Sequence, residues 1–207
     1  MINFPGSTKI GRRIPKEAFY RHLDLTASLK SKFVTDVDHI VVENSLTRES
    51  LRLAESSDVR EILLLSIALK KQDFDGKIVE AIARQNQHKL LFRLVYEGQE
   101  QLAVYEGKLY RTAWKASGES DLTLRGDTMT AIWEDLVRQI ALRPEIKMEE
   151  GESLCQQLKN QDVIDQLQKR IQKLDKAAWK EEQPKKRFAL YTEMMELKKQ
   201  LEELTHG

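Results

Sequence analysis

Cysteine is almost missing from this chain of 207 residues, which contains only Cys155. One cysteine cannot form an intramolecular disulfide, and the start of the chain lacks the pattern of a secretory leader, so we expect a reducing, cytoplasmic setting. Zinc sites built from paired cysteines are excluded for the same reason. We expect Cys155 itself to be a buried and inert thiol, because Leu154 and Leu158 place it in an amphipathic context.

Long apolar runs and an excess of one charge are also missing. The longest apolar stretch, residues 62–69, is far shorter than the roughly 20 residues of a membrane-spanning helix, and we expect no membrane anchor. The 34 Lys and Arg against 33 Asp and Glu give a net charge of +1, which argues against a polyanion binder that relies on the charge of the whole chain. Electrostatic binding must therefore be local. Residues 1–35 hold seven Lys or Arg against two Asp or Glu.

The sequence also lacks the motifs of common catalytic and metal sites. Its four histidines lie far apart, and no pair has the spacing of metal ligands on one helix. The glycines do not gather into a phosphate-binding loop, and no serine lies in a GxSxG turn. We therefore expect no catalytic residue, no metal site and no cofactor, and we expect that the protein is not an enzyme.

A metal-dependent nuclease with an unrecognised site is the alternative from the enzyme class. Restriction-type nucleases place an Asp on one strand and an acid-x-Lys set on the next, so that carboxylates hold a divalent ion beside a lysine. The most apolar strand of this chain ends in Lys70 and Lys71, but Ala68 and Leu69 stand two residues before them. The carboxylate that this chemistry needs is absent from that position.

The apolar pattern predicts an α+β fold, with a mostly antiparallel sheet packed by helices. Residues 59–69 are too continuously apolar for a half-exposed strand and should be central in the sheet. Turn residues separate three runs that should form an antiparallel meander, at 90–96, 101–105 and 108–114. We expect a further strand at 37–42, a helix or turn at 25–33, and helices near 15–20, 47–51, 78–86 and 129–140. The predicted core consists of Ile62, Leu64, Leu69, Leu91, Phe92, Ile132 and Trp133.

The last segment of the chain has the period of a coiled coil. Apolar residues recur at alternating spacings of three and four over residues 164–174 and again over 190–204. Pro184 lies between the two stretches and cannot continue an ideal helix, so they form either an antiparallel hairpin or one kinked helix. We favour the hairpin because it buries both stripes. The predicted organisation is a sheet domain over 1–144, a linker over 145–152 and a coiled-coil-like helical element over 153–207.

Two sets of residues are candidates for binding. Clustered cations can contact phosphates, and the nucleic-acid-binding candidates are Lys9, Arg12, Arg13, Lys16, Arg21, Lys185, Lys186 and Arg187. A solvated surface or an acidic partner is the alternative for each cluster. The partner-binding candidates are the residues of the C-terminal apolar stripe, Leu190, Met194, Leu197, Leu201 and Leu204. The meander aromatics form either a base-stacking platform or a sheet core, and we favour the core for Tyr96, Tyr105, Tyr110 and Trp114.

Five segments spread over nearly the whole chain carry a family resemblance. They are RIPKEAFY at 13–20, EILLLSIALK at 61–70, HKLLFRLVY at 88–96, YRTAW at 110–114 and EQPKKR at 182–187. In this order and spacing they resemble the bacterial domain-of-unknown-function family forty-three ninety-one. The resemblance implies no catalytic residue, because the family has no established activity. It implies a small companion of DNA methyltransferases and helicases in restriction-like or phage-defence gene neighbourhoods.

The residues and this resemblance together lead to one expected function. The chain would be a non-catalytic accessory or adaptor subunit of a bacterial DNA-targeting, restriction-like anti-phage assembly. It would act by protein binding, with a helicase, a methyltransferase or another defence subunit as partner, or with a second copy of itself through the C-terminal helices. DNA would be contacted through the complex. The alternatives are the metal-dependent nuclease and a stand-alone nucleic-acid-binding protein.

Overall fold

The structure is a computed structural model, and it describes residues 2–54, 58–143 and 151–206. The chain divides into two compact units, residues 1–141 and residues 142–207. Most of the predicted linker, residues 145–152, lies outside the described residues. The linker and the domain bounds attached to it therefore stay predictions.

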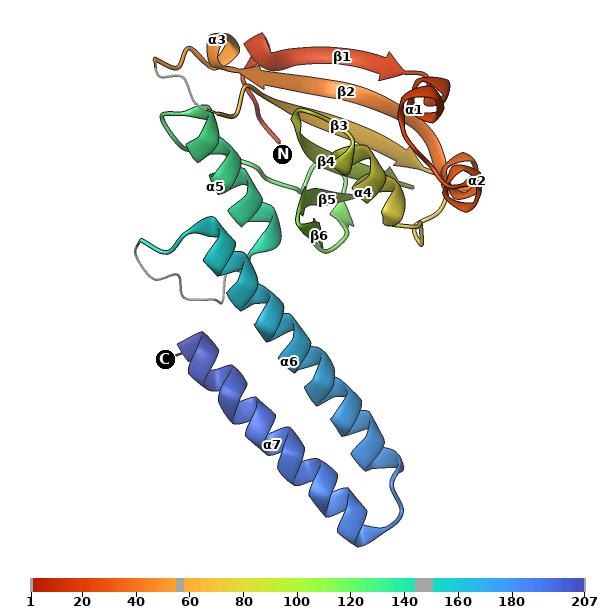
Figure 1. Cartoon of the computed structure of the whole chain (residues 1–207), viewed down its shortest axis with the longest axis vertical. Coiled ribbons are helices and arrows are strands. Elements are labelled where there is room, and N and C mark those ends of the chain that lie inside the picture. Colours follow the sequence, from red (N-terminus) through yellow and green to blue (C-terminus); the bar gives the residue numbers. More distant parts are fainter. Residues whose placement is uncertain (1, 55–57, 144–150, 207) are drawn as a thin grey trace. The chain divides into compact units, whose positions relative to one another are not determined.

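The first unit is built on a single seven-stranded sheet (Figure 1). The strands are β1 (Lys9–Ile14), β2 (Val37–Thr47), β3 (Glu61–Leu69), β4 (Lys89–Tyr96), β5 (Gln99–Glu106), β6 (Lys108–Arg111) and β7 (Lys115–Ala116). Their order is β1-β2-β3-β4-β5-β6, and β7 also pairs with β5. All pairs are antiparallel except β3 with β4. The predicted α+β fold with a mostly antiparallel sheet is confirmed, as is the meander of β4, β5 and β6.

Strand β3 lies in the interior of the sheet, as its apolar sequence predicted. It pairs with β2 on one side and with β4 on the other. The parallel β3–β4 pair requires a crossover connection, and α4 (Lys77–Arg84) supplies it. Because side chains alternate along a strand, β3 contributes to both faces of the sheet.

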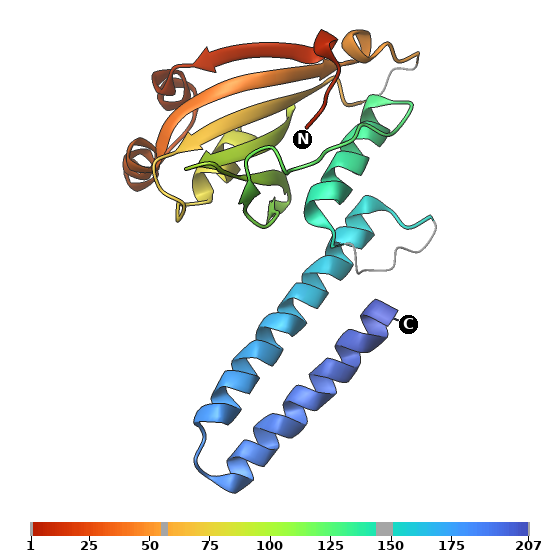
Figure 2. The ribbon, with the colours of Figure 1, turned by 180° about the vertical axis from the view of Figure 1, so that it is seen from behind.

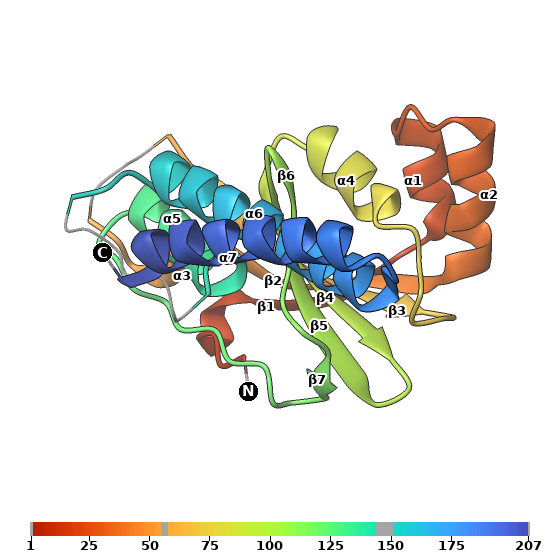
Figure 3. The same cartoon turned by 90° about the horizontal axis from the view of Figure 1, so that it is seen from below.

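Helices cover the two faces of this sheet in different ways. Helices α1 (Lys16–His22), α2 (Ala27–Asp36) and α4 lie over one face (Figure 3). The core between them and the sheet includes Phe33, Ile67, Leu69, Ile82 and Phe92. Helix α5 (Met129–Ala141) packs against β5 and β6. The short helix α3 (Arg48–Leu51) and a turn of 3-10 helix, η1 (Gly6–Thr8), complete the unit.

All seven residues of the predicted core are buried, but they belong to two layers. Leu69 and Phe92 face α2 and α4. Ile62 and Leu64 are out of phase with Leu65 and Leu69 of the same strand, so they point to the opposite face. That second face is seen in Figure 2, where α5 lies beside the sheet. The sequence identified which side chains are buried, and alternation along the strands divides them between the layers.

Strand β1 and the short β7 were not predicted from the sequence. No element was assigned to the residues of β1, whereas the structure pairs them with β2, which itself continues to Thr47 rather than ending near Val42. All but the last residue of β1 are exposed, so the apolar alternation that marks a strand is missing. The register shifts between Lys9 and Arg12, where Gly11 has a φ of +65°. An exposed, bulged edge strand has little apolar signal to detect.

The second unit contains an antiparallel hairpin of two long helices, α6 (Leu154–Lys180) and α7 (Pro184–His206) (Figures 1 and 2). The preferred hairpin is confirmed, and the kinked single helix is excluded. Pro184 is the first residue of α7, a position where its missing N–H and fixed φ suit a helix. Ser153 caps α6 by accepting a hydrogen bond from the backbone N–H of Gln156 at 3.3 Å. No helix in the described ranges combines the length and apolar character needed to span a membrane.

Cys155 departs from the expectation of a buried thiol, because it is exposed. Leu154 and Leu158 are both buried and lie four residues apart, on one side of α6. Cys155 follows Leu154 by one residue and is rotated by about 100° around the helix. The amphipathic context was recognised, but Cys155 lies on its polar side.

Candidate functional site

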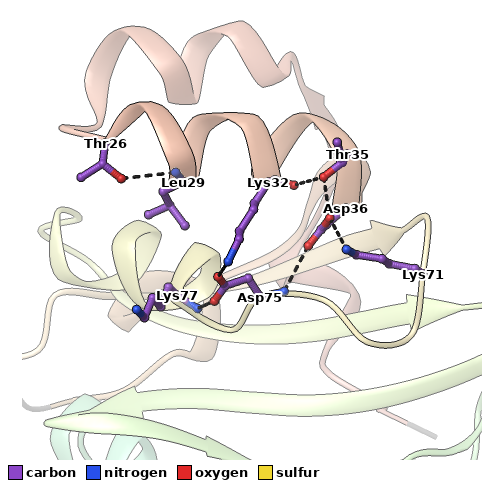
Figure 4. Close-up of polar contacts among 8 residues, drawn as sticks. All are labelled: Thr26, Leu29, Lys32, Thr35, Asp36, Lys71, Asp75 and Lys77. Atoms are coloured by element: carbon purple, nitrogen blue, oxygen red, sulfur yellow. Dashed lines mark hydrogen bonds and ion pairs between the residues drawn. The ribbon is translucent and has the colours of Figure 1, made fainter.

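Charged side chains gather where α2 and β3 end (Figure 4). Asp36 is the last residue of α2, and Val37, which begins β2, pairs with Leu69 at the end of β3. Because β2 and β3 run antiparallel, Asp36 lies next to the two lysines that follow β3. The backbone carbonyl of Asp36 accepts a hydrogen bond from the N–H of Lys70 at 2.8 Å. The topology thus brings the acid that precedes β2 to the lysines that follow β3.

The Asp36 carboxylate is buried and bound on both oxygens. Its Oδ1 lies 2.8 Å from Lys71 Nζ and accepts a hydrogen bond from the Thr35 hydroxyl at 2.7 Å. Its Oδ2 accepts a hydrogen bond from the backbone N–H of Asp75 at 3.1 Å. Burial raises the pKa of Asp36, but the hydrogen bonds from Lys71, Thr35 and Asp75, with the charge of Lys71, outweigh it. The pKa of this carboxyl therefore lies below its ordinary value.

Asp75 extends the network to the start of α4. Its Oδ2 lies 2.6 Å from Lys32 Nζ on α2, and its Oδ1 accepts a hydrogen bond from the backbone N–H of Lys77 at 3.0 Å. The Lys32 hydrogen bond is the main cause that lowers the pKa of Asp75, and the same bond raises the pKa of Lys32. The two aspartates together connect α2, the end of β3 and α4.

We call the bonded set of Asp36, Lys71, Asp75 and Lys32 the ionic lock. Asp36, the last residue of α2, supplies a carboxylate of the kind that the nuclease hypothesis placed beside the lysines. The carboxylates of a metal-dependent nuclease bind the divalent ion, whereas both oxygens of Asp36 accept hydrogen bonds from the protein. Within residues 2–54, 58–143 and 151–206, no group of three His, Cys, Asp or Glu is placed to hold a metal. The nuclease alternative must be tested by a cleavage assay.

A second ionic network crosses the opposite face of the sheet. Arg93 of β4 lies between Glu43 of β2, at 3.2 Å, and Glu100 of β5, at 2.7 Å. Glu100 is buried, and its other oxygen accepts a hydrogen bond from the backbone N–H of Ser120 at 2.9 Å. Burial raises the pKa of Glu100, but the bonds from Ser120 and Arg93 and the charge of Arg93 lower it by more. This network joins strands across the sheet.

The basic candidates near the N-terminus lie on and beside the edge strand β1. Lys9, Arg12 and Arg13 are exposed. Arg12 and Arg13 are adjacent on the strand, so they point to opposite faces of the sheet and do not form one surface. Lys16 and Arg21 belong to α1, and their side chains lie outside the described part of the structure. Phosphate contact by this group stays a prediction.

The meander aromatics belong to the packed sheet, in line with the preferred interpretation. Tyr110 is buried, and Tyr96 and Trp114 pack against the core under α2 and α4. The hydroxyl of Tyr105 accepts a hydrogen bond from Arg84 Nε at 2.6 Å, and the Arg84 guanidinium lies over the same ring. These contacts hold the rings within the fold.

The C-terminal partner-binding candidates are partly covered by the hairpin itself. Met194 is buried, Leu190, Leu197 and Leu201 are half-buried, and Leu204 is 48% exposed. Within the seam, α6 contributes the buried Ile164 and the half-buried Ile171 and Leu174. Much of the predicted docking seam therefore serves to join α6 to α7.

The largest exposed apolar side chains of the described residues gather instead around the turn between α6 and α7. Trp179 is 85% exposed, Phe188 is 72% exposed and Tyr191 is 52% exposed. Phe188 and Tyr191 were not among the predicted partner-binding residues, because they lie off the stripe that begins at Leu190. Both could have been found in the sequence as aromatic residues that lie outside the apolar stripe of a predicted hairpin helix.

These rings surround a hollow between the two helices. It has a volume of about 480 Å³ and is lined by Asp175, Ala178, Trp179, Pro184, Arg187, Phe188 and Tyr191. Ala178 is buried, and the lining side chains around it come from both helices. The basic candidates Lys185, Lys186 and Arg187 are exposed in the first turn of α7, directly beside these rings. We call residues 173–191 the hairpin tip.

Comparison with known proteins places the chain in a family without assigning an activity. No curated protein and no solved structure matches the sequence. One family model does match, over residues 2–201, and it covers both the sheet unit and the hairpin. The chain therefore belongs to the family described as Domain of unknown function (DUF4391).

Proposed function

We propose that this chain is a non-catalytic accessory subunit that binds another protein through its C-terminal hairpin. The observation that carries the proposal is the group of exposed aromatic rings at the hairpin tip, Trp179, Phe188 and Tyr191. Large apolar side chains that remain exposed together mark interaction surfaces, and aromatic residues are enriched in protein interfaces. The hairpin has already used its leucine seam to join its two helices, so these rings are available to a partner.

The charged groups of the sheet unit support a structural role for that unit. Asp36 and Glu100 are buried, and each is bound by a cation and by a backbone amide of the same chain. Carboxylates held in this way have lowered pKa values and stay ionised at neutral pH, so they are poor general acids and bases. We propose that the sheet unit is the stable body of the subunit.

The setting of the proposal is a DNA-targeting, restriction-like defence assembly of a bacterium. It comes from the family resemblance, which implies a helicase, a methyltransferase or another defence subunit as partner. DNA would be contacted mainly by that partner, and Lys9, Arg12 and Arg13 would add weak phosphate contacts. The cytoplasm is the compartment of such an assembly.

The test is affinity capture of the full chain from its native host, followed by reconstitution with the captured protein. Trp179→Ala with Phe188→Ala should remove the partner, because both rings would lie in the interface. Val163→Ala is the matched control, since Val163 is an exposed apolar residue of α6 outside the tip. Support requires that the purified partner binds the wild type and the control but not the tip variant. Equal binding by a folded tip variant would overturn the proposal.

A further inference from the structure

We infer that the hairpin tip binds an acidic protein segment that inserts an apolar side chain into the hollow between α6 and α7. This inference rests on the proposed function and names the chemistry of the partner. Two properties of the tip carry it, the shape and lining of the hollow and the local excess of positive charge.

The hollow has room for an apolar side chain, and most of its lining residues are apolar. Its volume of about 480 Å³ is bounded by three aromatic rings, by Ala178 and Pro184, and by the charged residues Asp175 and Arg187. Trp, Tyr and Arg are the residue types that most often dominate the binding energy of protein interfaces, and all three line this hollow. A groove between two helices is a common receptor for an amphipathic helix that presents apolar anchors. The pocket therefore fits an aliphatic or aromatic side chain.

The charge of the tip selects an acidic partner. Residues 173–187 contain six Lys or Arg and three Asp or Glu, a net charge of +3, although the whole chain carries only +1. Lys185, Lys186 and Arg187 occupy the first turn of α7, which has no acidic residue. The N-terminal end of a helix carries a partial positive charge and favours anions, so three cations are unfavourable there. Carboxylates of a partner would offset both the side-chain charges and the helix end.

A protein segment fits this surface better than a nucleic acid does. Nucleic-acid affinity comes largely from phosphate contacts. The tip also contains three acids, Asp175 on the hollow and Glu181 and Glu182 in the turn, and these would repel a continuous phosphate backbone. A peptide can place its carboxylates beside the cations and a neutral residue beside Asp175. Side chains that project singly from a peptide also match the hollow between the two helices.

The experiment is a selection of peptides by the full chain from a random display library, with displayed segments of about 16 residues, roughly four helical turns. We expect enriched sequences that combine Asp or Glu with aliphatic or aromatic anchors. Their synthetic versions should bind the wild type and the Val163→Ala control equally. Binding should weaken at least about tenfold for Trp179→Ala with Phe188→Ala, a factor that corresponds to about 1.4 kcal/mol. Reversal of charge at Lys185 and Lys186 to Glu should weaken it as well, while the helical content stays unchanged.

Several outcomes would overturn the inference. The inference is wrong if the enriched peptides lack acidic residues, or if the tip variant binds them as the wild type does. It is also wrong if no peptide is enriched over an empty support. Labelled single-stranded and duplex DNA are measured in parallel, and DNA binding that depends on Trp179 and Phe188 would identify a nucleic acid as the occupant. The capture experiment separates this result from the proposed function. If a host protein needs the tip but binds through a basic or neutral segment, the inference is refuted while the proposed function stands. If acidic peptides bind the tip but no host protein binds in a tip-dependent way, the proposed function is refuted while the inference stands.

Discussion

Asp36 is the residue whose replacement should most clearly reveal how the sheet unit is held together. Asp36→Ala removes an acceptor that is 1% exposed and that binds three donors, from Lys71, Thr35 and Asp75. A hydrogen bond to a charged group contributes about 1.5–3 kcal/mol, and a buried donor left without a partner costs about 1–3 kcal/mol. The Lys71 side chain is 52% exposed and can be rehydrated, so we discount its share. We expect Asp36→Ala to lower the free energy of unfolding by about 2–4 kcal/mol.

The pH dependence of this effect follows from the lowered pKa of Asp36. The native state holds this proton less tightly than the unfolded chain, whose carboxyl has the ordinary pKa of 3.8. The stabilisation is therefore complete above that value and is lost as the pH falls through the lower native pKa. The difference between the wild type and Asp36→Ala should be constant near neutral pH and should shrink as the pH falls below about 4. The conservative Asp36→Asn keeps the shape but not the charge, and should lose part of the stability.

The assay is equilibrium unfolding in denaturant, followed by tryptophan fluorescence. Trp114 and Trp133 belong to the sheet unit, whereas Trp179 belongs to the hairpin, so a Trp179→Phe background reports on the sheet unit. Asp73→Asn is the matched control, because Asp73 is an exposed acid of the loop before α4. A loss below about 1 kcal/mol for Asp36→Ala would refute the ionic lock, as would a difference that grows when the pH is lowered.

Three further measurements address the core, the basic strand and the nuclease alternative. Leu64 is 1% exposed, and Leu64→Ala should lower the free energy of unfolding by about 2–5 kcal/mol; a loss below about 1 kcal/mol would contradict a central β3. DNA or RNA binding by the isolated chain should be weak and should fall steeply with salt, and charge reversal at Arg12, Arg13 and Lys16 should abolish most of it. A tight complex at high salt would contradict this. With Mg²⁺ or Mn²⁺ the chain should leave several DNA forms intact, and cleavage that is lost in Asp36→Asn would establish the nuclease alternative instead.

The fold was largely predictable where apolar periodicity is strong. The continuous apolar run of residues 62–69 predicted the interior strand β3, and the turn residues predicted the meander of β4, β5 and β6. The two apolar stripes on either side of Pro184 predicted the hairpin of α6 and α7. Strand β1 could not be found in this way, because its side chains are exposed and its extended form depends on pairing with β2. Local sequence carries little information about an element that a distant segment stabilises.

The candidate sites were harder to predict for a related reason. Asp36 and Lys71 are far apart in the sequence, and only the antiparallel register of β2 and β3 places them 2.8 Å apart. The nuclease hypothesis required a carboxylate two positions before Lys70 or Lys71, whereas the acid that pairs with Lys71 precedes the neighbouring strand β2. Ion pairs between strands follow the topology of the sheet, which must be known before they can be sought.

The exposed aromatic rings of the hairpin, by contrast, follow from helix geometry once the seam is known. Consecutive residues of a helix are separated by about 100°, so Tyr191 lies about 100° from Leu190 and Phe188 lies about 200° from it. The stripe that starts at Leu190 faces α6, since Met194 is buried within the hairpin. A helix can turn only one side to a single neighbour, and α6 therefore cannot cover the leucine stripe and both rings together. Burial of Phe188 and Tyr191 requires a third surface, which is why the hairpin tip, and not the leucine seam, is the place where we expect a partner to bind.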